Sequence, residues 1–173
     1  MVKIFCAPRC TRDGSAAARS LLELAFNTEV GGVLPDIKKT PNGKPYFPAR
    51  PEIHFSLSHS RTHVLCGISF KPIGVDIESP RIISDQAAGY FSSPSELFFF
   101  EPLDLWVLKE SFVKLIGGRL SLLKKLNFSR ENGRIITPNE FAISKLYKIG
   151  DCRAAVSSFA AGLPESIELA SIT

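Results

Sequence analysis

Two pairs of alternating segments constrain the fold of this chain more than any other feature of its sequence. Apolar and polar side chains alternate along residues 53–60 and 63–70, and they alternate again along residues 141–149 and 152–160. Two such segments joined by two residues are typical of a β-hairpin. The chain is therefore expected to contain two hairpins, one early in the sequence and one near its end.

A strand and a helix are expected ahead of each hairpin, because apolar side chains recur there at strand or helical spacing. These elements are a strand at residues 3–7, a helix at 15–26, a strand at 73–78 and a helix at 103–116. The repeated order predicts an α+β fold with a pseudo-twofold duplication. Residues 1–72 and 73–173 would form the two halves, each a small antiparallel sheet packed on a helix, within one compact unit.

Shorter signals complete the expected elements. Ser93, Pro94 and Glu96 combine an N-cap, a proline at the first helical position and a capping box, so a helix is predicted to begin there. It must end before Pro102. Asn132-Gly133 indicates a tight hairpin turn.

The composition excludes a disordered chain. Hydrophobic residues make up 45% of the 173 residues, charged residues make up 22%, and 13 residues are Phe, so the chain can bury a core. No apolar run reaches the roughly 18 to 20 residues that a membrane span needs. Arg9 and Arg12 come too early for the apolar stretch of a signal peptide. A cytoplasmic protein without membrane contacts is expected.

The four cysteines do not form a disulfide framework in a chain of this length. Cys6 and Cys10 lie close in sequence, but no Cys or His pair follows at the spacing of a zinc site. All four thiols, those of Cys6, Cys10, Cys66 and Cys152, are expected to be reduced and mostly buried.

Positive charge is concentrated in the first half. Residues 1–72 hold ten Lys and Arg against five Asp and Glu, a net charge of +5, whereas residues 73–173 hold eleven against twelve, a net charge of −1. A nucleic-acid backbone would require a denser basic stripe. The distribution favours a small polyanionic ligand.

Asp76 and Glu78 are candidates for a metal site. Side chains alternate faces along a strand, so these two carboxylates point the same way, about 7 Å apart. Two carboxylates at that spacing can converge on a hard cation such as Mg²⁺. An amphipathic strand with a solvated polar face would show the same pattern.

Glu110 and Lys114 lie on the helix expected at residues 103–116. Its apolar face is formed by Leu105, Leu108, Phe112 and Leu115. Glu110 and Lys114 fall on the opposite face, where a glutamate four residues before a lysine is also an ordinary surface pair. Helical periodicity alone assigns them no chemistry.

Two loops carry further polar candidates. Ser58-His59-Ser60 ends a strand and would contact a phosphate or simply complete a turn; it lacks the Gly-x-Ser-x-Gly elbow of a serine hydrolase. Gly43-Lys44-Pro45 forms a rigid loop expected to present Lys44 outward, for a phosphate or for solubility. It is not a P-loop.

Four blocks occur in one order between residues 40 and 118. They are Gly43-Lys44-Pro45, Phe55-Ser-Leu-Ser58-His59-Ser60, Ile73-Gly74-Val-Asp76-Ile-Glu78 and Trp106-Val-Leu-Lys109-Glu110-Ser111-Phe112-Val-Lys114. In this order they resemble the Sfp-type 4′-phosphopantetheinyl transferases, and Arg12-Asp13 ahead of an Ala-rich helix is a weaker match. The resemblance implies the duplicated α+β fold. It also implies transfer of the phosphopantetheine arm of coenzyme A to a serine of an apo acyl or peptidyl carrier protein, with release of adenosine 3′,5′-bisphosphate.

The resemblance also implies roles for individual residues. Asp76, Glu78 and Glu110 would bind Mg²⁺, or Mn²⁺ in its place. The catalytic groups would be Glu110, Lys114, Asp76 and His59, with Lys114 at the leaving phosphate and Glu110 as a base for the serine. Contacts to coenzyme A would come from Arg12, Gly43, Lys44, Pro45, Ser58, His59, Asp76 and Lys114, with Arg12 and Lys44 near the 3′-phosphate.

Two alternatives to the transferase stay open. One is a non-catalytic relative that binds coenzyme A or a carrier protein, and the other is a Mg²⁺-dependent phosphohydrolase. A monomer is expected, since two fused halves already supply an interface. Carrier contacts or core packing would explain the aromatic residues Tyr90, Phe91 and Phe98 to Phe100.

Overall fold

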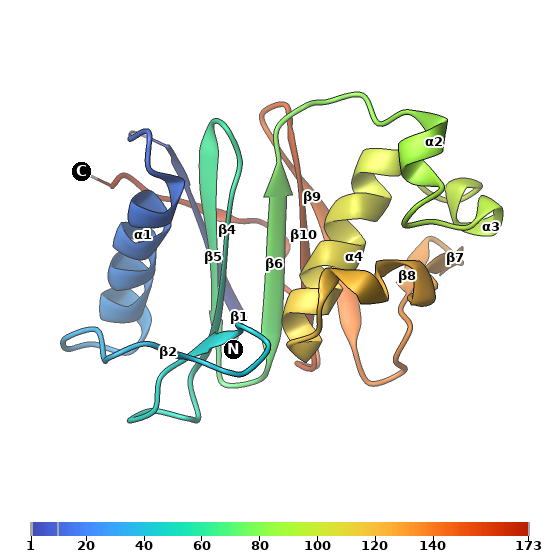
Figure 1. The fold of residues 1–173 in the computed structure, drawn as a ribbon. Helices are drawn as coiled ribbons and strands as arrows, with labels where there is room; N and C mark the ends of the chain where they lie inside the picture. Colours follow the sequence, from blue (N-terminus) through green and yellow to red (C-terminus); the bar gives the residue numbers. More distant parts are fainter. Residues whose placement is uncertain (1, 10, 173) are drawn as a thin grey trace.

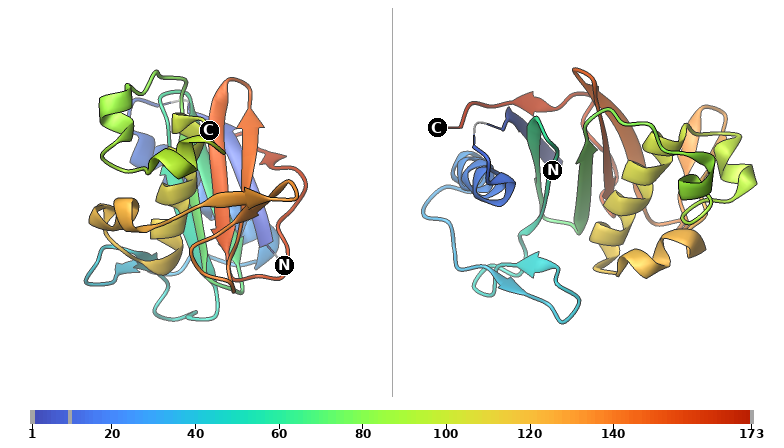
Figure 2. Two further views of the ribbon diagram at one scale, coloured as in Figure 1. Left: turned by 90° about the vertical axis from the view of Figure 1, so that its right-hand side faces the viewer. Right: turned by 45° about the horizontal axis from the view of Figure 1, so that its top comes forward.

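The computed structural model describes residues 2–9 and 11–172 as a stack of helix, sheet, sheet and helix (Figure 1). The right-hand view of Figure 2 shows α1 and α4 on the outer sides of the two sheets. The elements are β1 (Val2–Pro8), α1 (Gly14–Glu29), β2 (Lys38–Lys39), β3 (Pro45–Tyr46), β4 (His54–His59), β5 (His63–Ser69), β6 (Ile73–Glu78), α2 (Asp85–Ala88), α3 (Pro94–Leu97), α4 (Pro102–Ile116), the 3₁₀ helix η1 (Leu120–Lys125), β7 (Ser129–Glu131), β8 (Arg134–Ile136), β9 (Ile143–Ile149), β10 (Cys152–Ser158) and β11 (Glu168–Leu169).

The first sheet has the strand order β11-β1-β5-β4 and is covered by α1. Alternation along β1 separates two cores: Phe5 packs against α1, whereas Ile4 and Cys6 face the second sheet. Asp13 caps α1 by accepting hydrogen bonds from the backbone amides of Ser15 and Ala16. This sheet therefore buries both of its faces.

The second sheet has the order β6-β10-β9 and is covered by α4. The alternation predicted for β6 is confirmed, because Val75 packs between the sheets while Gly74 lies against the backbone of α4. A Cβ at residue 74 would overlap the Ser111 carbonyl and the Leu115 amide. The missing side chain thus lets β6 approach α4 closely.

The two sheets meet where β4 lies beside β6. These two strands are not paired by backbone hydrogen bonds. Two serine side chains of β4 instead accept hydrogen bonds from backbone amides of β6. Ser56 Oγ accepts from the Val75 amide at 3.0 Å, and Ser58 Oγ accepts from the Ile77 amide at 3.3 Å. This seam brings the polar face of β4 to the acidic face of β6.

Most predicted elements are confirmed. Both hairpins form, the capping box begins α3, and Asn132 and Gly133 adopt positive φ angles in the β7–β8 turn. The strand orders β1-β5-β4 and β6-β10-β9 are alike, as a duplication would produce, although the duplication itself and its boundaries stay predictions. η1 and β11 were not predicted, and β11 pairs with β1 in parallel, so a C-terminal segment extends the N-terminal sheet.

The cysteine prediction is confirmed where the structure describes it. Cys6, Cys66 and Cys152 are buried free thiols, and burial raises the pKa of Cys6 to about 12. Cys10 lies outside the described residues. None of the helices in the described ranges combines the length and the hydropathy that a bilayer crossing requires.

Candidate active site

Asp76 lies at the seam between the two sheets and is only 5% exposed. Its Oδ1 atom accepts hydrogen bonds from Ser58 Oγ and from Lys114 Nζ, both at 2.7 Å. Its Oδ2 atom is buried and has no hydrogen-bond partner among the described residues. A buried carboxylate oxygen without a partner is costly, so this atom is available to a positive ligand.

Ser58 uses its full hydrogen-bonding capacity in this arrangement. Its hydroxyl donates to Asp76 and accepts from the Ile77 amide and, at 3.1 Å, from Lys114 Nζ. A hydroxyl has one donor and two acceptor sites. The predicted contact between Ser58 and coenzyme A would therefore have to replace one of these bonds.

Glu78 lies further along the same face of β6 and is half-buried. Its Oε1 atom accepts from Trp106 Nε1 and from Arg81 Nη2, each at 3.2 Å. The Arg81 guanidinium also lies over the Trp106 ring, 5.3 Å from its centroid. Burial and the neighbouring charge of Asp76 raise the pKa of Glu78.

Glu110 reaches the same region from α4. Burial raises its pKa to about 7, the charges of Asp76 and Glu78 act in the same direction, and the charge of Lys114 opposes them. The three carboxylates are thus close enough to repel one another. The ordinary surface pair between Glu110 and Lys114 is not formed, because Lys114 instead pairs with Asp76.

A metal site is not assembled in advance. Among residues 2–9 and 11–172, no three Asp, Glu, His or Cys side chains lie close enough together to hold an ion as they stand. Lys114 and Arg81 occupy Oδ1 of Asp76 and Oε1 of Glu78. The residues nevertheless fit a cation, since the orphaned Oδ2 atom and the mutual repulsion of the carboxylates both favour positive charge.

A cavity of about 430 Å³ opens beside this acidic cluster. Its wall combines the predicted loop with the predicted helix: Gly43, Lys44, Pro45, Phe55, Glu110, Lys114 and residues 117–120. The left-handed conformation of Gly117, with φ 64°, ends α4 at this wall. The first, second and fourth sequence blocks therefore meet at one opening.

The expectation that Lys44 points outward is wrong. Its ammonium group turns inward and donates to the carbonyl oxygens of Leu115 at 2.5 Å and Ile73 at 3.4 Å. Burial lowers the pKa of Lys44 to about 8. Unpaired carbonyls at the C-terminal end of α4 attract a cation, so Lys44 caps the helix.

His59 and Arg12 lie at the opposite end of β4 from Lys44. The His59 ring packs on Gly14 at the start of α1, where an added Cβ would lie 2.8 Å from His59 Cγ. Arg12 is exposed just before the helix, and its carbonyl accepts from Arg9 Nη2. Arg12 and Lys44 therefore do not converge as predicted; Arg12 shares the open edge with His59, and Lys44 is held by α4.

Comparison with known proteins finds sequence similarity to 4′-phosphopantetheinyl transferases. The chain is 34% identical over 122 residues to a 4′-phosphopantetheinyl transferase of Bacillus subtilis, and this match covers 63% of the chain and 52% of the relative. It is 39% identical over 93 residues to 4′-phosphopantetheinyl transferase Sfp of Bacillus subtilis (strain 168), covering 46% of the chain and 40% of Sfp. Over these segments the chain is similar to Sfp-type 4′-phosphopantetheinyl transferases. It spans about half the length of the first of these relatives, and no family model matches it.

The structure also contains a buried ion pair that the sequence did not predict. Lys109 of α4 is fully buried, and its ammonium group donates to Glu96 and to the carbonyls of Phe91, Leu123 and Leu126. The pair ties α4 to α3 and to η1. The signal in the sequence was the position of Lys109, one turn after Leu105 on the buried face of the helix.

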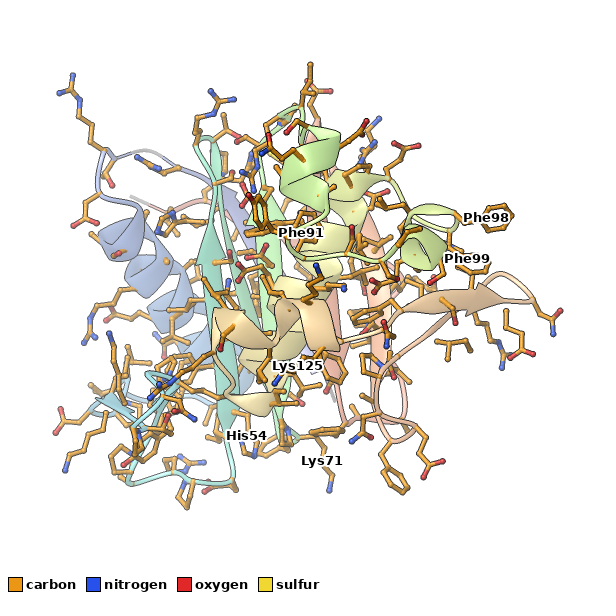
Figure 3. All side chains as sticks on the ribbon, turned by 45° about the vertical axis from the view of Figure 1, so that its right-hand side comes forward. His54, Lys71, Phe91, Phe98, Phe99 and Lys125 are labelled. Atoms are coloured by element: carbon orange, nitrogen blue, oxygen red, sulfur yellow. The ribbon has the colours of Figure 1, made fainter. Side chains whose placement is uncertain are left out.

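A second cavity, of about 580 Å³, lies beside Arg81 and Trp106, the two hydrogen-bond partners of Glu78. Its lining includes Arg81, Tyr90, Phe91, Trp106 and Lys124. The aromatic candidates divide between surface and core: Phe91 and Phe100 are 4% exposed, whereas Tyr90 is 71% and Phe98 is 83% exposed. Phe98 and Phe99 project from the edge of the molecule (Figure 3).

Proposed function

We propose that the chain transfers the 4′-phosphopantetheine arm of coenzyme A to a serine of an apo acyl or peptidyl carrier protein and releases adenosine 3′,5′-bisphosphate. One observation carries the proposal. Asp76 and Glu78 from β6 and Glu110 and Lys114 from α4 meet beside a cavity that the Gly43-Lys44-Pro45 loop lines. The identity to known transferases supports the same reaction.

The acidic cluster is the part of the site that suits a divalent cation. Asp76, Glu78 and Glu110 would bind Mg²⁺, or Mn²⁺ in its place, which when bound neutralises charge on the diphosphate oxygens of coenzyme A. The orphaned Oδ2 of Asp76 and the raised pKa values of Glu78 and Glu110 support this choice. Oxygen ligands are those that Mg²⁺ prefers.

The proton transfers would be carried by α4. In the proposed reaction, a bond forms between the serine oxygen and the phosphorus atom of the arm, and the phosphorus–oxygen bond to the nucleotide breaks. Glu110 would accept the serine proton directly or through a water; in the ion-free site, burial raises its pKa to about 7. Lys114, whose side chain is 31% exposed, would stabilise and protonate the departing phosphate.

The remaining candidates would position the substrate. His59 and Arg12, at the open edge next to the start of α1, would contact phosphate groups of coenzyme A by charge-assisted hydrogen bonds. Gly43 and Pro45 would shape the wall of the cavity, and Asp76 with Ser58 would orient Lys114. We propose a cytoplasmic monomer that acts on the carrier without nucleic acid or membrane.

The reaction is tested by incubating the protein with coenzyme A, Mg²⁺ and a panel of apo carrier proteins, followed by mass spectrometry. A carrier should gain the mass of one phosphopantetheine arm. Asp76→Ala and Glu110→Ala should abolish the gain, while the exposed-site control Glu140→Ala should retain it. Full transfer by both site variants would refute the assignment. Phosphate release without a carrier would indicate a hydrolase, and coenzyme A binding without transfer would indicate a non-catalytic relative.

A further inference from the structure

Arg81 is a charged group that the proposed reaction does not use. It follows β6 by three residues, and its guanidinium makes two contacts: a hydrogen bond to Glu78 Oε1 at 3.2 Å and stacking over the Trp106 ring at 5.3 Å. Trp106 Nε1 donates to the same carboxylate oxygen. Arg81, Glu78 and Trp106 thus form a closed triangle at the edge of the acidic cluster.

Each carboxylate of β6 has its own internal cation. Asp76 pairs with Lys114 at 2.7 Å and Glu78 pairs with Arg81 at 3.2 Å. For Glu110, no ion pair is formed with any residue in the described ranges. The acidic face is therefore partly neutralised by the protein itself, at the atoms that a divalent cation would need.

The position of Arg81 allows its side chain to leave Glu78. Residues 79–84 have no helix or strand, the Arg81 side chain is 46% exposed, and neighbouring Ile82 is 99% exposed. Arg81 also lines the second cavity, together with Lys124 and aromatic side chains. The side chain thus lies on an exposed segment and borders a cavity, apart from the buried core.

We propose that Arg81 is a built-in counter-ion that competes with the divalent cation for Glu78 and turns into the second cavity when that cation binds. The inference rests on the proposed function, because it takes Glu78 as a metal ligand. It gives Arg81 a positioning role, since Arg81 acts through Glu78 rather than on the substrate. Linkage requires the converse as well. If an anionic group of the carrier protein binds Arg81 in the second cavity, that contact strengthens divalent-ion binding at Glu78.

The competition is measured by titrating the protein with Mn²⁺ and following free Mn²⁺ by electron paramagnetic resonance, without substrate. Exposed ion pairs contribute modestly, so Arg81→Ala should tighten Mn²⁺ binding by about two- to fivefold. Arg81→Lys keeps the charge but loses the planar stacking, so its Mn²⁺ affinity should lie between those of the unaltered chain and Arg81→Ala. Arg130→Ala is the matched control. The Arg130 guanidinium lies over the Phe100 ring, 4.9 Å from its centroid, and makes no ion pair with Glu78 among the described residues.

A double-mutant cycle isolates the pair. In a Glu78→Gln background, Arg81→Ala should change the weakened Mn²⁺ affinity less than in the unaltered chain, since the ion pair is already absent and only the weaker interaction of Arg81 with Glu110 remains. Equal or weaker binding by Arg81→Ala and Arg81→Lys, in a chain that does bind Mn²⁺, would overturn the inference and leave the proposed function standing. Absence of Mn²⁺ binding in the unaltered chain would overturn the metal assignment and this inference together.

Discussion

Replacing Glu110 with Gln should stabilise the ion-free protein at neutral pH while removing its proposed activity. Glu110 is a partly buried carboxylate close to the charges of Asp76 and Glu78, and its pKa is raised from 4.5 to about 7. Glutamine keeps the size of the side chain but cannot ionise. The substitution therefore removes a repulsion that the folded state bears and the unfolded chain does not.

The sign and size follow from proton linkage. Below about pH 4.5 Glu110 is protonated in both states and contributes no difference. As the pH rises from about 4.5 to about 7, the unfolded chain binds fewer protons than the folded one, so the free energy of unfolding falls. A rise in pKa from 4.5 to about 7 corresponds to a loss of about 3 kcal/mol, and solvent screening at this partly exposed carboxylate reduces the expected loss to about 1–2 kcal/mol.

Urea unfolding from pH 4.5 to 8.5 with a chelator present measures the effect. The stability of Glu110→Gln minus that of the unaltered chain should increase up to about pH 7 and then level off. Glu140→Gln, at an exposed site, should show no such rise. A flat difference curve for Glu110→Gln would refute the claim that burial and carboxylate repulsion act on Glu110.

Three other predictions concern the framework of the site, each measured by chemical unfolding. Lys109→Met leaves Glu96 buried without its cation and should cost about 3–5 kcal/mol; a loss below about 1 kcal/mol would contradict the pair's structural role. Gly74→Ala forces a Cβ into the backbone of α4 and should cost about 2–3 kcal/mol, whereas Gly162→Ala, with open space around it, should be nearly neutral. Lys44→Met should lose about 1 kcal/mol of helix capping at pH 7. Because the pKa of Lys44 is lowered to about 8, the unaltered chain should gain stability relative to this variant from about pH 8 to 10.5; no gain would argue against its burial.

The sequence predicted the acidic strand well because strand geometry is local. Alternation alone places Ile73, Val75 and Ile77 on one face and Asp76 with Glu78 on the other, and the structure confirms this division. The hairpins and the end of α4 at Gly117 were predicted for the same reason. Their signals lie within a few residues of the structure that they specify.

Lys44 and Lys109 were missed or misplaced because their partners are distant in sequence. Lys44 is held by carbonyls 29 and 71 residues away, so its inward orientation depends on where α4 ends. Lys109 needs Glu96, which a separate short helix supplies. A charged residue at a buried helical position indicates that a partner exists, but only the assembled fold identifies it.

Ser58 shows how the predicted roles depend on one another. Its hydroxyl can donate to only one acceptor, which is Asp76 in this structure, and Lys114 is bound to the same carboxylate. Neither residue can turn fully to a phosphate unless Asp76 gains another positive partner, because a buried carboxylate without one is unstable. The phosphate contacts expected of Ser58 and Lys114 therefore require that the acidic cluster be neutralised first. Without cation binding at Asp76, neither contact is expected to form.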